Sequence, residues 1–123
     1  MPGEDASEHR VQSALVATLR HRLRANVVCM AIPNGGARHP IIGRQLKAEG
    51  LLPGSPDLVF ALERAKVFWL EMKKANERNH RDGGLSDEQV GLHYKMKKNG
   101  HDIRIAYSVD EALELLEERG LLR

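Results

Sequence analysis

Residues 54–73 read GSPDLVFALERAKVFWLEMK, and this stretch decides the fold of the chain. Two runs rich in strand-forming residues, 58–62 and 67–72, flank a polar turn at residues 63–66. This pattern predicts a β-hairpin. The second run is apolar at successive positions up to Leu70, which is typical of a central strand covered on both faces. We therefore expect Trp69 in the core and not on a surface that stacks on bases.

Three charged residues lie at the same end of this predicted hairpin. Side chains alternate along a strand, so Glu71 and Lys73 share one face. Folding about Arg64 and Ala65 brings Asp57 back opposite them. Asp57 shares their face only if the numbers of paired residues add up to an even value, so we predict an odd-length loop or a bulge. The two carboxylates and the ammonium then converge at the mouth of the sheet.

This convergence indicates a particular chemistry. A glutamate and a lysine on the continuation of a buried face are costly unless they are paired or functional. Two carboxylates and a backbone carbonyl suit Mg²⁺, which also keeps several waters. Such an ion polarises a phosphoryl oxygen, and a neighbouring lysine can orient the attacking water. The pattern therefore indicates hydrolysis of a phosphodiester, although a Glu-x-Lys triplet alone is more typical of a solvated strand end.

The segment before the hairpin predicts two helices and a strand. Ser7 can cap a helix that runs to about Arg24. Apolar residues recur along it at four-residue spacing, namely Val11, Leu15, Leu19 and Leu23. Residues 27–32 read as a buried strand that ends at the Pro-Asn-Gly-Gly turn of residues 33–36. Residues 41–49 are expected to form a short helix.

The segment after the hairpin predicts two capped helices around a strand. A polar loop covers residues 75–85. Residues 86–89 and 108–111 have the spacing of capping boxes, so we expect helices to about residues 99 and 120. Residues 103–107 form a strand between them. The order α-β-(α)-β-β-α-β-α predicts a mixed α/β domain with one small central sheet.

Composition favours one compact globular domain over residues 1–123. Hydrophobic residues make up 41% and charged residues 29% of the chain, which argues against disorder. No apolar run approaches the roughly 18 residues of a membrane span, and the acidic first eight residues lack the apolar core of a signal peptide. Cys29 is the only cysteine, which excludes an internal disulfide. We therefore expect a cytoplasmic protein without a membrane partner.

The net charge of +2 says little, but its distribution is uneven. Residues 10–50 contain seven Arg or Lys and a single Glu, whereas residues 110–123 contain five acidic residues and two Arg. Such asymmetry permits a phosphate-binding face on the first half of the chain. A set of solvated helix faces explains the same pattern, so charge alone leaves both interpretations open.

Short motifs occur along the chain in an order that resembles one nuclease family. Pro56-Asp57 with Glu71-Met72-Lys73 resembles the signature of the PD-(D/E)XK nuclease superfamily. Further motifs resemble the virus-type replication-repair nuclease (VRR-NUC) domain: Glu8 and Gln12 in the first helix, the turn at 33–36, Gly-x-Pro-Asp at 54–57 and Leu-Ser-x-x-Gln at 85–89. The resemblance covers nearly the whole chain. It implies a restriction-endonuclease-like α/β fold, with a small mixed central sheet flanked by helices.

The resemblance also implies roles for individual residues. Asp57 and Glu71 would bind Mg²⁺ or Mn²⁺, helped by the backbone carbonyl of Met72. Lys73 would position the nucleophilic water. Glu8 would contact a metal directly or through water.

Three further residues have two interpretations each. Gln89 is a catalytic candidate, but as a capping-box residue it needs no catalytic role. Gln12 is a candidate for contacting and orienting the metal ligands without binding the metal itself. His93, one turn after Gln89, can face the site in the same way, although a lone helical histidine is more often structural.

The resemblance implies DNA as the partner, bound mainly through its backbone. Basic residues and one histidine near the site are candidates for these contacts, each with a solvated surface role as the alternative: Arg38, His39, Arg44, Lys47, Lys74 and Arg78. Relatives of this size are stand-alone phage or bacterial enzymes, often homodimers that cut Holliday junctions. The apolar residues of segment 41–52 can pack on the core or on a second subunit, and the sequence leaves this open.

The function expected is a divalent-metal-dependent DNA endonuclease acting on branched DNA, with a Holliday junction as the leading substrate and a homodimer as the active form. A nick, flap or end-processing nuclease on the same fold is the first alternative. A non-catalytic DNA-binding module and a hydrolase of small phosphoesters are the others.

Overall fold

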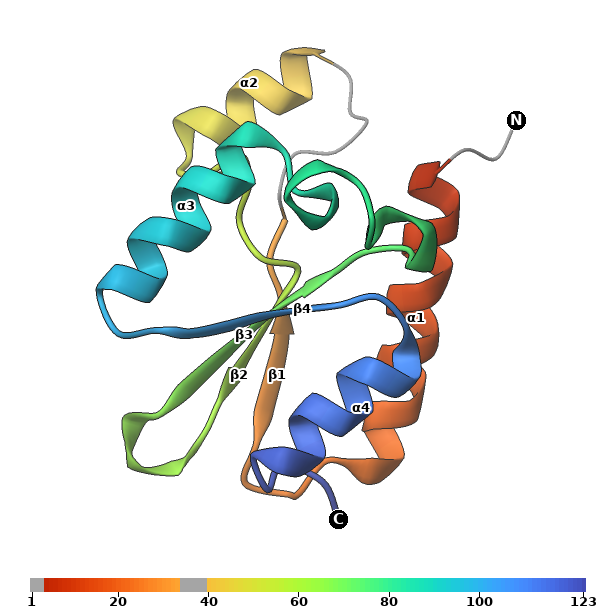
Figure 1. Cartoon of the computed structure of the whole chain (residues 1–123). Helices are drawn as coiled ribbons and strands as arrows, with labels where there is room; N and C mark the ends of the chain where they lie inside the picture. The colour runs from red at the N-terminus through yellow and green to blue at the C-terminus, as the bar shows by residue number, and fades with distance from the viewer. Residues whose placement is uncertain (1–3, 34–39) are drawn as a thin grey trace.

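The computed structural model describes residues 4–33 and 40–123, arranged around a mixed four-stranded sheet (Figure 1). The strands are β1 (Val28–Ala31), β2 (Leu58–Ala61), β3 (Val67–Met72) and β4 (Asp102–Ala106), in the spatial order β1-β2-β3-β4. The first three are antiparallel neighbours, and β4 runs parallel to β3. The expected mixed sheet flanked by helices is confirmed.

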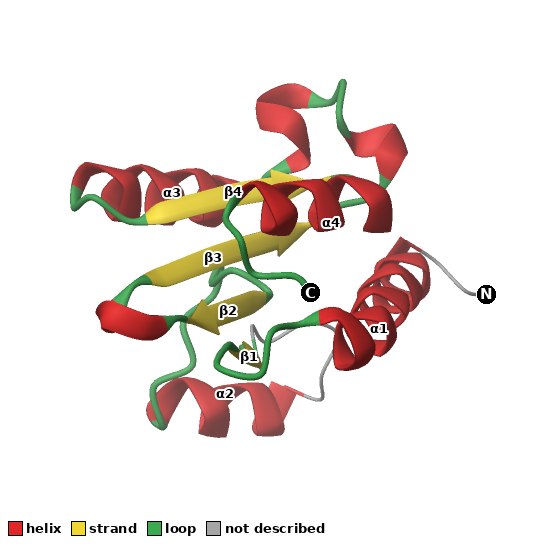
Figure 2. Ribbon diagram, turned by 90° about the horizontal axis from the view of Figure 1, so that it is seen from below, coloured by secondary structure: helices red, strands yellow, loops and turns green. Residues whose placement is uncertain are grey.

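In the described part of the chain, four α-helices surround the sheet and three short 3-10 helices lie in the loops. The α-helices are α1 (Glu4–Arg22), α2 (Pro40–Ala48), α3 (Asp87–Lys98) and α4 (Val109–Glu118). The 3-10 helices are η1 (Glu63–Ala65), η2 (Ala75–Glu77) and η3 (Arg81–Gly84). Figure 1 shows α1 and α4 together on one side of the sheet and α3 on the other. Seen from below, α2 lies beside β1 at the far end from α3 (Figure 2).

The hairpin of β2 and β3 has the register that places Asp57 beside Glu71. Leu58 pairs with Leu70 and Ala61 with Val67, so the connecting loop contains five residues, 62–66. The prediction of an odd-length loop is therefore confirmed. Since Leu58 pairs with Leu70, the residue before it faces Glu71 across the two strands.

The core lies between the sheet and the pair of helices α1 and α4. Phe60 and Phe68 stack with ring centroids 5.8 Å apart, and both rings are buried. Leu15 and Leu19 from α1 and Leu116 from α4 close over them. Each such side chain contributes roughly 1.5–3 kcal/mol when fully buried. This packing anchors the strands whose ends carry the charged residues.

The prediction that residues 27–32 form a buried strand is wrong. β1 is an edge strand, and Val28 and Met30 are 52% and 48% exposed. The apolar run is therefore partly on the surface. Trp69 was also expected in the core, but it is only half-buried, and its Nε1 donates to Nδ1 of His101 at 3.2 Å.

Several element boundaries differ from their predicted positions. α1 begins at Glu4 and ends at Arg22, so Ser7 lies inside the helix and not at the position before its first residue. The loop at residues 75–85 is not irregular throughout, because η2 and η3 lie within it.

The two predicted capping boxes turned out differently. The first is complete, as described with the site below. In the second, Ser108 accepts from the backbone of Glu111, but the Glu111 side chain accepts from the Tyr107 amide instead of the Ser108 amide. Over residues 4–33 and 40–123, no helix is long and apolar enough to cross a membrane.

Candidate active site

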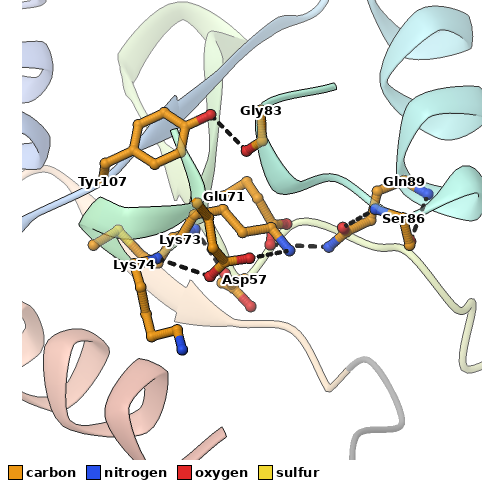
Figure 3. Close-up of polar contacts among 10 residues, drawn as sticks. Asp57, Glu71, Lys73, Lys74, Gly83, Ser86, Gln89 and Tyr107 are labelled. Carbon is orange, nitrogen blue, oxygen red and sulfur yellow. Dashed lines mark hydrogen bonds and ion pairs between the residues drawn. The ribbon is translucent and has the colours of Figure 1, made fainter. Parts of the chain in front are cut away.

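The charged ends of β2 and β3 meet at the mouth of the sheet. Figure 3 shows Asp57, Glu71 and Lys73 gathered at one place, with Gln89 reaching toward them from α3. The backbone amide of Met72 donates to Oδ2 of Asp57 at 2.7 Å, which fixes the aspartate against the end of β3. Asp57 lies close enough to Glu71 for its negative charge to raise the pKa of the glutamate. The predicted convergence is therefore present.

Glu71 is the most deeply buried charged residue of this group. Only 2% of its surface is exposed. Burial, together with the negative charge of Asp57, raises its pKa to about 9, although the positive charge of Lys73 opposes the shift. Its Oε1 receives no hydrogen bond from the described part of the chain. A buried carboxyl oxygen without a hydrogen-bond partner is expensive, and a bound cation would relieve this cost.

Gln89 makes the capping contacts of α3 and also hydrogen-bonds a carboxyl of the candidate site. Its side-chain Oε1 accepts from the backbone amide of Ser86 at 2.9 Å. Its backbone amide donates to the Ser86 hydroxyl, which completes the capping box of α3. Its Nε2 donates to Oε2 of Glu71 at 3.0 Å. The capping interaction thus orients the same side chain that holds the buried carboxylate.

Gly54 lets the chain segment before β2 approach the start of α3. Its φ is +89°, and a Cβ at this position would lie 3.0 Å from the backbone carbon of Glu88. A side chain here would separate the Asp57 segment from the helix that carries Gln89. The glycine of the Gly-Ser-Pro-Asp motif is therefore explained by packing.

Glu77 is a member of the cluster that the sequence did not reveal. Its Oε2 lies 4.0 Å from Nζ of Lys73, and both side chains are about nine-tenths buried. Its Oε1 accepts from the backbone amide of Lys74 at 3.1 Å. The residue lies in a segment predicted as a polar loop, where a four-residue spacing from Lys73 carries no signal. Only the turn of η2 brings the two side chains together.

Glu8 is brought into this cluster by α1. Burial raises the pKa of its carboxyl to about 7, helped by a hydrogen bond with Glu77 and by the negative charges of Glu77 and Asp57. Lys73 acts in the opposite direction. Gln12, one turn further along α1, is partly buried. The role of Glu8 as a metal contact stays a prediction.

His93 lies beneath the site as a neutral imidazole. It is 4% exposed, and its Nε2 has no hydrogen-bond partner within the described residues. Burial, with the positive charges of Lys97 and Lys73, lowers its pKa to about 4. An uncharged buried ring cannot bind a phosphate by charge. A role in supporting the site stays a prediction.

The candidate DNA contacts are spread over several elements. Arg44 and Lys47 are exposed on α2, and Lys74 is half-buried after β3. Arg78 forms an ion pair with Glu111 and lies 4.5 Å from the centre of the Tyr107 ring, so its charge is partly engaged within the protein. Arg38 and His39 lie outside the described residues. Their roles in DNA binding stay predictions.

The donor atoms at the mouth fit a hard divalent cation. Asp57 and Glu71 supply carboxylate oxygens, one of which lacks any donor from the described chain. The repulsion that raises the pKa of Glu71 is the repulsion that a cation removes. Within residues 4–33 and 40–123, no group of three or more His, Cys, Asp or Glu side chains is placed to hold a metal ion. Mg²⁺ often uses only one or two carboxylates and completes its octahedron with water and substrate oxygens.

Comparison with known proteins places the fold. No family model and no curated protein matches the chain. The chain is similar to a solved structure described as "VRR_NUC domain", with a TM-score of 0.58 and 19% sequence identity. The match covers 89% of this chain and 94% of that one. The similarity concerns the fold, and it confirms the resemblance and the restriction-endonuclease-like α/β architecture inferred from the motifs.

Proposed function

We propose that this chain is a divalent-metal-dependent DNA endonuclease. One observation carries the proposal: the buried carboxyl of Glu71 lies beside Asp57 and Lys73 at the mouth of a sheet, in a chain with the fold of a VRR_NUC domain. Neither a surface salt bridge nor a structural core requires two carboxyls pressed together with an unpaired oxygen. Metal-assisted phosphodiester hydrolysis does require such a pair.

The chain supplies the ligands and the positioning groups for this reaction. Asp57, Glu71 and the backbone carbonyl of Met72 would hold Mg²⁺ or Mn²⁺, and Glu8 would bind it directly or through water. When bound, the ion supplies Lewis-acid polarisation of the phosphate and lowers the pKa of a bound water. Lys73 orients the attacking water and offsets the charge that grows on the phosphate. Gln89 holds Glu71 in the ligating orientation by its hydrogen bond to Oε2.

The proposed substrate is branched DNA, in the first place a four-way junction cut by a homodimer. Two symmetric cuts need two sites related by a two-fold axis, which a dimer provides. Large apolar side chains on the surface support a subunit contact: Val28, Met30 and Leu52 are each about half exposed. The proposed DNA contacts are Arg38, His39, Arg44, Lys47, Lys74 and Arg78. We also propose a cytoplasmic location.

A cleavage assay tests the proposal. Labelled linear duplex, flap and four-way junction DNA are incubated with Mg²⁺, Mn²⁺ or EDTA. Lys73→Ala is compared with Lys98→Ala, which removes an exposed lysine at the other end of α3. We expect paired symmetric cuts in the junction that EDTA abolishes, that Lys73→Ala reduces to a residual rate and that Lys98→Ala preserves.

The other outcomes are equally informative. Cutting of flaps or linear DNA under the same controls keeps the nuclease and rejects the junction specificity. Tight DNA binding without cleavage by any metal rejects the enzyme in favour of a DNA-binding module.

A further inference from the structure

Glu77 is an acidic residue that the proposed reaction does not account for, yet the fold buries it at the site. It is 7% exposed. It contacts groups from two separate parts of the chain: the amide of Lys74 and the ammonium of Lys73 after β3, and the carboxyl of Glu8 on α1. The burial of this carboxyl is compensated by its contacts with these groups, so a role for Glu77 is sought in them.

The charge state of Glu77 follows from these partners. Burial alone would raise the pKa of its carboxyl, but hydrogen bonds with Glu8 and the Lys74 amide, with the positive charges of Lys73 and Lys74, outweigh burial and lower it. Glu77 is therefore the ionised member of the pair that it forms with Glu8. It presents a fixed negative charge toward Lys73.

The loop that follows β3 is built to hold Glu77 in place. Gly84 has a φ of +87°, and a Cβ there would lie 2.8 Å from Cβ of Glu77. The loop can therefore close over Glu77 only because residue 84 has no side chain. The hydroxyl of Tyr107 donates to the carbonyl of Gly83 at 2.7 Å and ties the loop to the end of β4 (Figure 3).

Several acidic side chains compete for the ammonium of Lys73, so a partner that fixes its position has a function. The ammonium acts electrostatically on Glu71 and Glu8 as well as on Glu77. Without a dedicated partner, the flexible lysine is free to turn toward the Asp57–Glu71 pair, where a metal ion would have to displace it. Glu77 holds the ammonium to one side of that pair.

We propose that Glu77 is the positioning residue for Lys73, and this inference rests on the proposed nuclease function. Glu77 acts through the lysine and does not touch the reacting atoms. It keeps Nζ near the carboxyl pair but outside it, where the lysine can reach the attacking water and the scissile phosphate.

A double-mutant cycle tests this dependence. Single-turnover cleavage is measured at saturating DNA and Mn²⁺ for the wild type, Glu77→Gln, Lys73→Gln and the double variant. We expect Glu77→Gln to slow cleavage about tenfold in the wild-type background and to have no further effect once Lys73 is replaced. Glu77→Asp, which keeps the charge, should recover part of the rate.

Equal slowing in both backgrounds would overturn the proposal, because a residue that only supports the fold acts whether or not Lys73 is present. Glu114→Gln removes an exposed acidic residue of α4 and serves as the matched control, which should not change the rate. Thermal unfolding of each variant identifies any that fails to fold.

A second measurement needs no activity, metal or DNA. In a lysine-selective NMR spectrum, assigned with Lys73→Arg, we expect Lys73 to show an ordered side chain in the wild type and in Glu77→Asp. Glu77→Gln should move its signal to that of a mobile lysine. An unchanged signal would overturn the positioning role even if the chain is a nuclease. If the chain cleaves no DNA, the nuclease function fails, and this spectrum still decides whether Glu77 orders Lys73.

Discussion

At the scale of the residue, the central feature is a carboxyl that the fold keeps away from water. The pKa of Glu71 is about 9, mainly through burial and then through Asp57. Between its ordinary pKa near 4.5 and this value, the folded protein binds a proton that the unfolded chain releases. The contribution of Glu71 to the free energy of unfolding is therefore fully present at low pH and is lost as pH rises toward 9. Burial of Glu71 therefore lowers the free energy of unfolding at neutral pH, and a bound cation would offset this loss.

This cost predicts the behaviour of Glu71→Gln in metal-free buffer. The amide carries no charge at any pH, so the variant should be more stable than the wild type at pH 8 by at least about 1 kcal/mol. The difference should shrink as pH falls toward 4.5, because below that value Glu71 is protonated in the unfolded chain as well as in the folded protein. Urea unfolding at a series of pH values measures this. A variant that is less stable than the wild type at pH 8 would contradict it.

Metal binding should appear as added stability even without DNA. Millimolar Mg²⁺ or Mn²⁺ should raise the Tm of the EDTA-treated wild type, because a ligand that binds only the folded state stabilises it. Asp57→Asn should remove most of this shift. Asp110→Asn changes an exposed aspartate of α4 and should retain the full shift. Equal shifts in both variants would show that the ion binds elsewhere.

At the scale of the element, the loop between β3 and α3 is shaped by glycines. Gly84→Ala puts a Cβ 2.8 Å from Glu77 in a left-handed conformation, so it should cost about 1–3 kcal/mol of stability. Gly100 has a similar φ of +91° but open space around it, so Gly100→Ala carries only the conformational cost. Comparing the two by urea unfolding isolates the contact with Glu77. Equal losses would mean that the loop can shift away.

At the scale of the whole molecule, the sheet has one poorly covered edge. β1 carries Val28 and Met30 on the surface, each about half exposed. Natural edge strands are usually protected by charge, by bulges or by another chain. The position of these residues is consistent with the proposed homodimer.

The edge gives a test of the subunit contact. If β1 forms the subunit contact, Met30→Glu should shift the chain from dimer to monomer, as measured by light scattering after size exclusion. Tyr94→Glu alters another exposed large side chain, on α3, and should leave the dimer intact. A monomeric wild type would reject the homodimer. An unaffected dimer in Met30→Glu would place the contact elsewhere.

Local patterns made much of the fold predictable. The alternation in β3 and the five-residue loop before it determined that Asp57 and Glu71 share a face, since a strand has a strict period of two. The Ser86–Gln89 spacing identified the start of α3, because capping depends on residues three positions apart. These features depend on neighbours in the chain, and such neighbours are visible in a sequence.

What the sequence determined by itself is the order of the elements, the hairpin register and the acidic and lysine residues at its mouth. The tertiary structure decided the rest. It made β1 an exposed edge, brought the capping residue Gln89 into hydrogen-bonding contact with Glu71, and buried Glu77 beside Lys73. Burial and long-range contacts depend on which elements become neighbours in space. That choice is made by the packing of the whole chain, and no local period or spacing records it.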